Sequence, residues 1–321
     1  MHRKPKILVI RFSSIGDIIL TTPIIRCLKL QLNAEVDFLT KSKYKEILLS
    51  DIYLSNIFTL SQNTKETIGC LKSQKYDFVV DLQNNFRSLR IRLALGVKSY
   101  TYIKSSFKRY LLIYFGINLL HDHIVDRYFN AIKRLGVFND GKGINYLVST
   151  NVDVKFKIDQ DYICWCIGGS HENKKLSAYQ ILHVVEKLNL PVVFIGGDKE
   201  RLITNKIIKN TNSKHIYDFC GKNSIQESAY LLQKSKLVLT NDTGMMHLAS
   251  AFDNPIISFW GCTKPSLGFQ PYIAKQFENI ISPLSNRPCS KHGKYCRIQD
   301  NGCVKAIDSQ VIYEKIVKLL K

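Results

Sequence analysis

The sequence has no run of apolar residues near the roughly 20 needed to span a bilayer as a helix, and it has no internal repeat or low-complexity tract. It shows no secretory signal, since charged N-terminal residues lead directly into an apolar segment, Lys6–Ile10. Nine cysteines, an odd number and widely scattered, do not suit a disulfide framework. We therefore expect a cytoplasmic protein with reduced thiols, and neither a membrane-spanning nor a disulfide-stabilised secreted one.

Acidic residues are also scarce relative to basic ones. The chain has 26 Asp and Glu and 46 Lys and Arg, so its net charge is +20. The stretch from residue 82 to residue 121 contains no acid. It holds seven basic residues, Arg87, Arg90, Arg92, Lys98, Lys104, Lys108 and Arg109. Such a field favours a polyanionic partner, which leaves nucleic acid, an anionic lipid surface or a phosphorylated substrate open.

Apolar segments alternate with helical patterns along all 321 residues, a length that suits two domains. The expected strands are Lys6–Ile10, Val36–Leu39, Phe78–Leu82, Tyr162–Ile167, Val192–Ile195, Leu237–Leu239 and Ile256–Phe259, with helices through Leu28–Leu32 and over Tyr179–Leu188 and Arg201–Lys209. This alternation predicts parallel sheets covered on both faces. A polar stretch, Asn139–Asp161, is expected to link domains 1–150 and 151–321, with ligands at the carboxyl ends of the strands, facing a cleft.

The most informative segment, residues 240–251, reads T-N-D-T-G-M-M-H-L-A-S-A between two apolar segments. It is expected to form a polar turn that opens a helix after a buried strand. The first N–H groups of a helix lack internal partners and favour an anion, so a phosphate-bearing ligand is one interpretation. The other is that Asp242 and Thr243 are ordinary helix N-caps.

Three more loops follow expected strands and carry polar residues. Asp17, at the end of the 11–17 loop, could cap a helix or act as general base on a substrate hydroxyl. The glycines of the 168–175 loop allow close backbone approach to a ligand, and Lys174 or Lys175 could meet phosphate charge or simply be solvated. The loop Gly196–Glu200 places a carboxylate where nucleotide sites often bind a ribose hydroxyl, although the dinucleotide fingerprint is absent.

Together these loops resemble glycosyltransferase family 9, the ADP-heptose:lipopolysaccharide heptosyltransferases, over nearly the whole chain. Residues 13–17 match S-S-x-G-D and residues 242–249 match D-T-G-x-x-H-L-A, and both matches are specific. Supporting matches are Y-D-x-x-I-D-L-Q at 76–83 with R-S at 87–88, the lysine-containing loop at 168–175, and G-x-T-x-P at 261–265.

The resemblance implies an α/β protein of GT-B architecture, with two Rossmann-like doubly wound domains facing a cleft. It implies an acceptor domain over 1–150 and a donor domain over 151–321. The reaction would be inverting transfer of a heptose from ADP-heptose to an inner-core lipopolysaccharide acceptor at the inner membrane, without cofactor, metal or nucleic acid. Asp17 would be the catalytic base. Donor contacts would come from Lys174, Glu200, Asp242, Thr243, Gly244 and His247, and acceptor contacts from Ser14, Gly16, Arg87, Arg90 and Arg92.

Some positions depart from the family pattern. Gly169 replaces the usual Ala, Leu176 and Ser177 replace Trp-Pro, and Lys264 stands where Asp or Glu is common. These positions shape the donor pocket, so a different nucleotide sugar is the alternative donor. A non-catalytic polyanion-binding protein is the alternative from another functional class, but it gives no reason for Asp17 or for the turn at Asp242.

Two features lie outside this assignment. Cys289, Cys296 and Cys303 recur every seven residues, which is not the usual paired spacing of a zinc site, and structural thiols are the favoured interpretation. Residues 105–120 combine aromatic and leucine side chains with basic neighbours. They are expected to form a buried helix with a basic end or, alternatively, a segment lying on an anionic bilayer.

Overall fold

The computed structural model describes residues 3–149, 152, 158–211, 213 and 215–321. The chain forms two compact units, one of residues 1–104 and 122–147 and one of residues 105–121 and 148–321. The expected domain boundary at residue 150 therefore differs from the structure in one respect. Residues 105–121, called here the 105–121 excursion, precede that boundary but belong to the C-terminal unit. Of the expected linker Asn139–Asp161, residues 150–151 and 153–157 lie outside the described residues.

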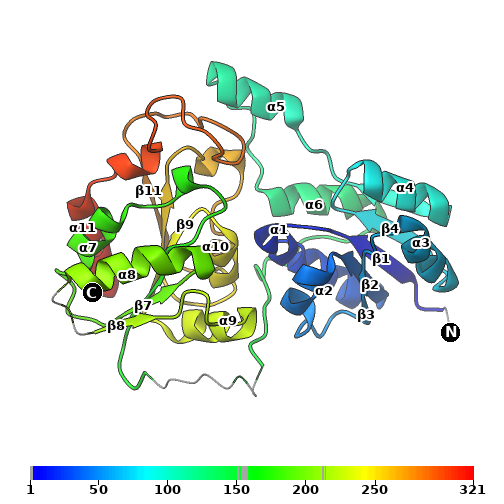
Figure 1. Ribbon diagram of the computed structural model, residues 1–321. Coiled ribbons are helices and arrows are strands. Elements are labelled where there is room, and N and C mark those ends of the chain that lie inside the picture. Colours follow the sequence, from blue (N-terminus) through cyan, green and yellow to red (C-terminus); the bar gives the residue numbers. More distant parts are fainter. Residues whose placement is uncertain (1–2, 150–151, 153–157, 212, 214) are drawn as a thin grey trace. The chain divides into compact units, whose positions relative to one another are not determined.

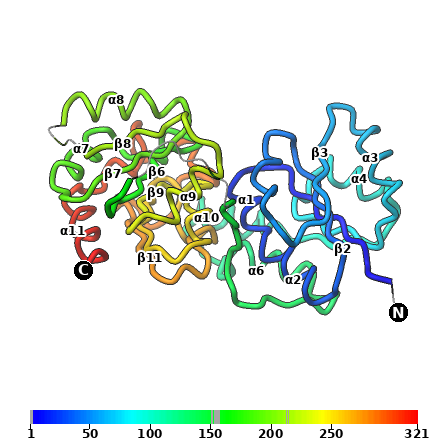
Figure 2. The backbone as a smooth tube through the Cα atoms, turned by 90° about the horizontal axis from the view of Figure 1, so that it is seen from below, coloured from blue at the N-terminus to red at the C-terminus, as the bar shows by residue number. Residues whose placement is uncertain are grey.

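The N-terminal unit is a five-stranded, all-parallel sheet in the order β3-β2-β1-β4-β5 (Figure 1). Its strands are β1 Lys6–Ile10, β2 Glu35–Thr40, β3 Asn56–Thr59, β4 Phe78–Asp81 and β5 Lys98–Thr101. Its α-helices are α1 Ile15–Ile19, α2 Thr22–Leu32, α3 Thr64–Ser73, α4 Phe86–Leu95 and α6 Ile124–Ile132. Helices α3 and α4 lie side by side in Figures 1 and 2, and α2 contacts α6.

The C-terminal unit is a six-stranded parallel sheet in the order β11-β10-β9-β6-β7-β8. Its strands are β6 Ile163–Cys166, β7 Val192–Ile195, β8 Ile216–Asp218, β9 Leu237–Asn241, β10 Ile256–Trp260 and β11 Phe277–Ile281. Its α-helices are α5 Ser106–Tyr110, α7 Ala178–Val185, α8 Arg201–Asn210, α9 Ile225–Lys234, α10 Gly244–Ala249 and α11 Ser309–Leu320.

Buried apolar strands explain both sheets. Every residue of β6, β7, β9 and β10 is buried, which a strand requires when helices cover both faces of its sheet. Trp165 packs its ring against Phe194 and Phe259 from neighbouring strands, and α7 and α11 add aliphatic side chains to this core. The expected parallel α/β architecture is confirmed. Strands β3, β5, β8 and β11 were not predicted, since they are short or only partly buried.

The excursion over residues 105–121 contains α5 (Figure 1). A π-helical turn, Leu111–Phe115, directly follows this helix. Leu112 is buried with Leu120 against Leu267 of the C-terminal unit, whereas Phe107 and Phe115 are exposed. The expectation of a buried helix therefore holds for one face only. Among the described residues, no helix has both the length and the apolar character needed to cross a membrane.

Candidate functional site

Each unit reverses its strand order at one point, and the predicted site loops follow the strands on either side of it. In the N-terminal unit β1 lies beside β4, so the loop after Ile10 adjoins the loop after Asp81. In the C-terminal unit β6 lies beside β9, so the loop after Cys166 adjoins the turn after Asn241. Doubly wound sheets bind ligands at this switch point, outside the carboxyl ends of the strands.

Asp17 lies in the first turn of α1 and both of its carboxylate oxygens have partners. Arg11 Nη2 lies 2.7 Å from Oδ1, and Ser14 donates to Oδ2 from its backbone N at 3.0 Å and from its Oγ at 2.8 Å. The Asp17 side chain remains 25% exposed. The loop thus holds the carboxylate in one orientation and leaves it accessible, which suits a base as well as a cap.

Arg11 is itself fixed from several sides, which makes the orientation of Asp17 firm. Its Nη1 donates to the Leu82 carbonyl at 2.5 Å and to the Tyr128 hydroxyl at 3.1 Å, and its Nε donates to the Ser13 carbonyl at 2.8 Å. One buried guanidinium therefore joins the β1 loop to the β4 loop. Arg11 was not among the site residues expected from the sequence, although it directly follows β1.

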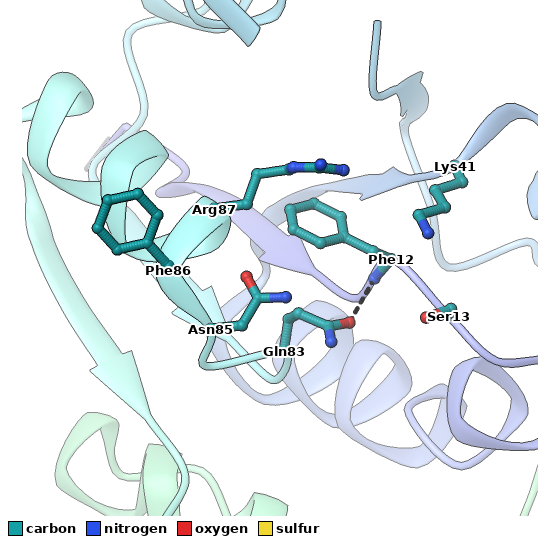
Figure 3. Close-up of a pocket in the computed structure, with 7 residues that line it drawn as sticks. All are labelled: Phe12, Ser13, Lys41, Gln83, Asn85, Phe86 and Arg87. Atoms are coloured by element: carbon teal, nitrogen blue, oxygen red, sulfur yellow. Dashed lines mark hydrogen bonds between the residues drawn. The ribbon is translucent and has the colours of Figure 1, made fainter. Parts of the chain in front are cut away.

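A pocket of about 440 Å³ opens at this switch point. Its lining residues come from the β1, β2 and β4 loops and the start of α4, and they are Phe12, Ser13, Lys41, Gln83, Asn85, Phe86 and Arg87 (Figure 3). Gln83 is fixed because its Oε1 accepts from the Phe12 N–H at 2.9 Å. Two cations, two amides and two aromatic rings suit a polar ligand that carries negative charge.

The other predicted acceptor residues take different positions. Arg90 is exposed and is not among the residues that line the pocket. Arg92 Nε lies 3.1 Å from the buried Asp81 carboxylate, so its charge serves the fold of this unit. Ser14 supplies the bonds to Asp17, and Gly16 is buried within α1. Of the three arginines, Arg87 alone lines the pocket, while Phe12, Lys41 and Gln83 are lining residues that sequence reasoning did not select.

Asn241 joins the two site loops of the C-terminal unit. Its Nδ2 donates to the carbonyls of Ile167 and Gly168, each at 3.0 Å, and its side chain is buried. The last residue of β9 thereby fixes the path of the chain as it leaves β6. Asn241 lies within the 240–251 segment that the sequence singled out. Its role in holding the end of β6 becomes visible only from the pairing of β6 with β9.

Lys174 and Asp242 form an ion pair across these two loops. Lys174 Nζ lies 2.7 Å from Asp242 Oδ2 and donates to the Asp242 carbonyl at 3.1 Å, and each side chain is 11% exposed. Burial alone would raise the pKa of Asp242, but Lys174, with smaller contributions from Thr263 and His247, outweighs it and lowers that pKa below its usual range. The structure thus brings together two predicted donor residues 68 positions apart.

Lys175 faces a different pair of carboxylates. Its Nζ lies 2.6 Å from Glu172 Oε1 and 2.7 Å from Glu200 Oε1. Glu200 also accepts from the Gly197 N–H at 2.9 Å and is 6% exposed. Both Glu200 oxygens therefore hold the protein's own loops, which leaves little of the carboxylate for a ribose hydroxyl.

The turn after Asp242 is closed by a helix cap. Thr243 is the N-cap of α10, and its hydroxyl accepts from the Met245 N–H at 3.3 Å. Gly244 is the first residue of α10, and His247 is buried one turn later with its ring 6.5 Å from that of Phe269. Of the two caps proposed from sequence, Thr243 is the cap and Asp242 instead binds Lys174.

Four cysteines, one more than the seven-residue repeat suggested, lie together in the C-terminal unit. Cys262, which follows β10, lies beside Cys289, Cys296 and Cys303. The four sulfur atoms all lie within 4.8 Å of one another. No disulfide is present, since all nine cysteines are free. Structural thiols without a metal were expected from three cysteines only. The fourth, Cys262, lies 27 residues before Cys289 in the sequence.

Comparison with known proteins places these features in context. The model of glycosyltransferase family 9 (heptosyltransferase) matches residues 67–298. Lipopolysaccharide heptosyltransferase 1 of Campylobacter coli is 24% identical over 98% of this chain and 98% of its own. Among solved structures, a family 9 glycosyltransferase of Veillonella parvula superposes with a TM-score of 0.79 at 16% identity, covering 98% of this chain and 97% of the other. The E. coli ADP-heptose LPS heptosyltransferase II gives 0.76 at 20% identity, with 98% of both chains covered.

Proposed function

The chain belongs to glycosyltransferase family 9, the heptosyltransferase family, and we propose that it transfers a heptose from ADP-heptose to an anionic inner-core saccharide of lipopolysaccharide. It is a glycosyltransferase enzyme of the two-unit GT-B type. The observation that carries the specific proposal is the pair of switch points. One bears an accessible, oriented carboxylate beside a polar pocket, and the other bears a lysine tied to the D-T-G turn.

The acceptor is proposed to bind in the pocket of the N-terminal unit. Lys41 and Arg87 would meet phosphate or carboxylate groups, and Gln83 and Asn85 would donate to sugar hydroxyls. Ser13 lines the pocket and is next in sequence to Ser14, which binds Asp17. A hydroxyl bound at that wall would lie on the loop that also carries Asp17, and general-base catalysis requires it to come within hydrogen-bond reach of that carboxylate.

The proposed reaction is a single in-line displacement. Asp17 takes the proton of the acceptor hydroxyl while that oxygen forms a bond to the anomeric carbon of the donor. The bond from that carbon to the diphosphate oxygen breaks on the opposite side, so the configuration inverts and ADP leaves. Arg11 orients the carboxylate throughout and stabilises its charge.

The donor diphosphate is proposed to bind at the Gly168 loop and the turn at Asp242. Lys174 and the N–H groups near Thr243 and Gly244 would meet the charge that develops on the leaving group, so the step proposed here uses no metal cofactor. Asp242 holds Lys174 in place. Glu200 would contribute to donor binding mainly by positioning Lys175. His247, buried in α10 after this turn, would help to order the pocket.

A transfer assay with a panel of ADP-, GDP- and UDP-sugars tests this proposal. We expect ADP-heptose to give product of inverted anomeric configuration and to raise the melting temperature by mass action. Preference for another nucleotide sugar would overturn the donor assignment within the family. Salt-dependent nucleic-acid binding without any sugar transfer would overturn the proposed function.

We also propose that the enzyme works at the inner-membrane surface, in the cytoplasm. Phe107, Tyr110 and Phe115 expose apolar surface beside Lys108, which suits an anionic bilayer. Arg109, which belongs to the basic stretch seen in the sequence, is buried with its guanidinium on Ser106 Oγ at 3.3 Å and does not add to this surface. The segment also belongs to the C-terminal unit and not to the expected 1–150 domain.

Co-sedimentation with vesicles tests the membrane proposal. Phe107→Ser with Lys108→Gln should reduce binding to anionic vesicles at low salt while transfer to a soluble acceptor stays normal. Leu202→Ser, at an exposed apolar residue of α8, is the matched control and should leave binding unchanged. If the wild-type protein does not bind anionic vesicles at low salt, the proposal is wrong.

A further inference from the structure

The four clustered cysteines have the geometry of a closed metal site. The sulfur–sulfur distances are 3.1 Å for Cys296–Cys303, 3.6 Å for Cys289–Cys303 and 3.9 Å for Cys289–Cys296, and all four sulfurs lie within 4.8 Å of one another. A tetrahedral ion with metal–sulfur bonds of about 2.3 Å sets its sulfurs about 3.8 Å apart. The observed spacing fits one ion at the centre. A cluster of several iron atoms would spread its cysteines over different irons and hold them farther apart.

The surroundings of the sulfurs suit thiolates. The N–H groups of Ile298 and Cys303 point at the sulfurs of Cys296 and Cys262, at 3.5 and 3.4 Å. Lys264, two residues after Cys262, is 2% exposed, and no carboxylate among the described residues forms an ion pair with it. A divalent ion with four thiolates carries a net charge of −2, which a buried ammonium group nearby would partly offset.

The cluster also lies at the base of a long loop that needs support. Residues 282–302 contain no helix or strand, and a stretch of this length without regular secondary structure is uncommon in a compact domain. Cys289 and Cys296 lie within it, Cys303 directly follows it, and Cys262 follows β10 in the sheet. A metal bound to all four would join the loop to the sheet.

This loop packs closely on the loop of the proposed donor lysine. Asn173 Nδ2 donates to the Lys294 carbonyl at 3.1 Å. Gly293 and Gly302 have positive φ, and a Cβ on them would lie 2.7 Å from Lys174 Cγ and from the Asn173 Cα, respectively. On another side, Arg287 and Arg297 donate to backbone carbonyls of the 105–121 excursion. The position of Lys174 thus depends on how this loop is held.

We propose that Cys262, Cys289, Cys296 and Cys303 bind one divalent metal ion, zinc or iron(II), in a closed tetrathiolate site that fixes the 282–302 loop against the Lys174 loop. Each thiol releases its proton on binding, so four protons leave per ion bound. All four positions on the ion are occupied by protein, which makes the role structural. The ion takes no part in the transfer step.

Elemental analysis of the full-length protein, purified without added chelator, tests this proposal. We expect one equivalent of metal per chain, with zinc and iron distinguished by the analysis itself. Cys296→Ser with Cys303→Ser should lose that equivalent, while Cys70→Ser, at an exposed cysteine of the other unit, should keep it. The same metal content in wild type and double variant, or none in the wild type, would overturn the proposal.

Cobalt binding by the wild-type protein provides a readout that does not depend on a variant folding. Cobalt(II) added to demetallated protein should give the thiolate charge-transfer and ligand-field bands of a tetrahedral tetrathiolate site, saturating at one equivalent. Chelation should lower the melting temperature by several degrees, and zinc should restore it. Absent bands, or disulfides among these four cysteines in the freshly purified protein, would overturn the proposal. Neither readout involves sugar transfer, so its failure is distinct from failure of the proposed function.

Discussion

The two units have related topologies, and each holds a carboxylate at its switch point, but in different ways. In the N-terminal unit Asp17 is bound by Arg11 and Ser14 of its own loop, and a quarter of its side chain is exposed. In the C-terminal unit Asp242 is paired with Lys174 from another loop, and only 11% of each side chain is exposed. An oriented and accessible carboxylate can exchange a proton with a bound hydroxyl. A buried ion pair instead fixes two loops in relation to each other, so the first arrangement suits chemistry and the second suits binding.

The largest effect is expected at Asp17. Asp17→Asn should lower kcat by about 10²–10⁴-fold, the usual worth of a general base, with donor affinity unchanged. Ser14→Ala removes one bond to the carboxylate but keeps the base, so it should reduce kcat far less. Steady-state kinetics with donor titration measures both variants. If Asp17→Asn retains more than half of the wild-type kcat, Asp17 is only a cap and the contrast between the units disappears.

The adjacent lysines should differ in their effect on donor binding. Lys174→Ala should weaken ADP binding by about 10- to 100-fold, since a charged hydrogen bond contributes about 1.5–3 kcal/mol, with adenosine binding little changed. Both variants should lower thermal stability, because each leaves a buried carboxylate, Asp242 or Glu200, without its cation, but Lys175→Ala should leave ADP affinity nearly unchanged. Calorimetry and thermal unfolding distinguish them. Equal losses of ADP and adenosine affinity in Lys174→Ala would reject its role as a phosphate ligand.

A smaller effect is expected where β9 holds the end of β6. Asn241→Asp keeps the shape of the side chain. It replaces the amide NH2 group, which donates to two backbone carbonyls, with a carboxylate oxygen that cannot donate and is repelled by them. We expect a loss of about 1–3 kcal/mol of stability and a higher KM for the donor, with kcat less affected. Ser235→Ala, which removes a buried hydroxyl that donates to the Leu232 carbonyl just before the opposite end of β9, is the control for KM. An unchanged KM in Asn241→Asp would show that the two loops are positioned independently of this residue.

The smallest expected effect is the pH dependence of stability that arises from Asp51. Burial raises the pKa of Asp51 in the N-terminal unit to about 6, against smaller opposite effects of the Tyr53 N–H, Asn145 and Arg26. The folded state then holds this proton more tightly than the unfolded chain, in which the pKa is about 3.9. Its contribution to stability is therefore present below about pH 4 and lost as the pH rises through 6.

Asp51→Asn should consequently stabilise the protein by about 1–2 kcal/mol above pH 7 and make no difference near pH 4. Asp242→Asn should act with the opposite sign at neutral pH, because the pKa of Asp242 is lowered in the fold. Urea unfolding at several pH values measures both. Stabilisation by Asp242→Asn at pH 7 would contradict the assignment of its ion pair as favourable.

Local sequence determined the strands that set the architecture. β1 and β7 span the predicted residues, and β9 and β10 extend the predicted strands by two residues and one residue, because a buried parallel strand is a continuous apolar segment visible in the sequence. The polar loops after them were also visible, and so was the family, since short motifs such as S-S-I-G-D and D-T-G stand directly behind these strands. Short or half-exposed strands such as β5 gave no comparable signal.

Tertiary structure alone decided which side chains meet. Strand order places Lys174 on Asp242, Lys175 on Glu200 and Asn241 on the Gly168 loop, and it adds Cys262 to the other three cysteines. It also directs Arg92 to Asp81 and Arg109 to Ser106, although both arginines belong to one continuous basic stretch of the sequence. Local propensity fixes where a strand begins and ends, but partners are set by sheet order, and contacts across 68 or 41 residues leave no periodic trace in a single sequence.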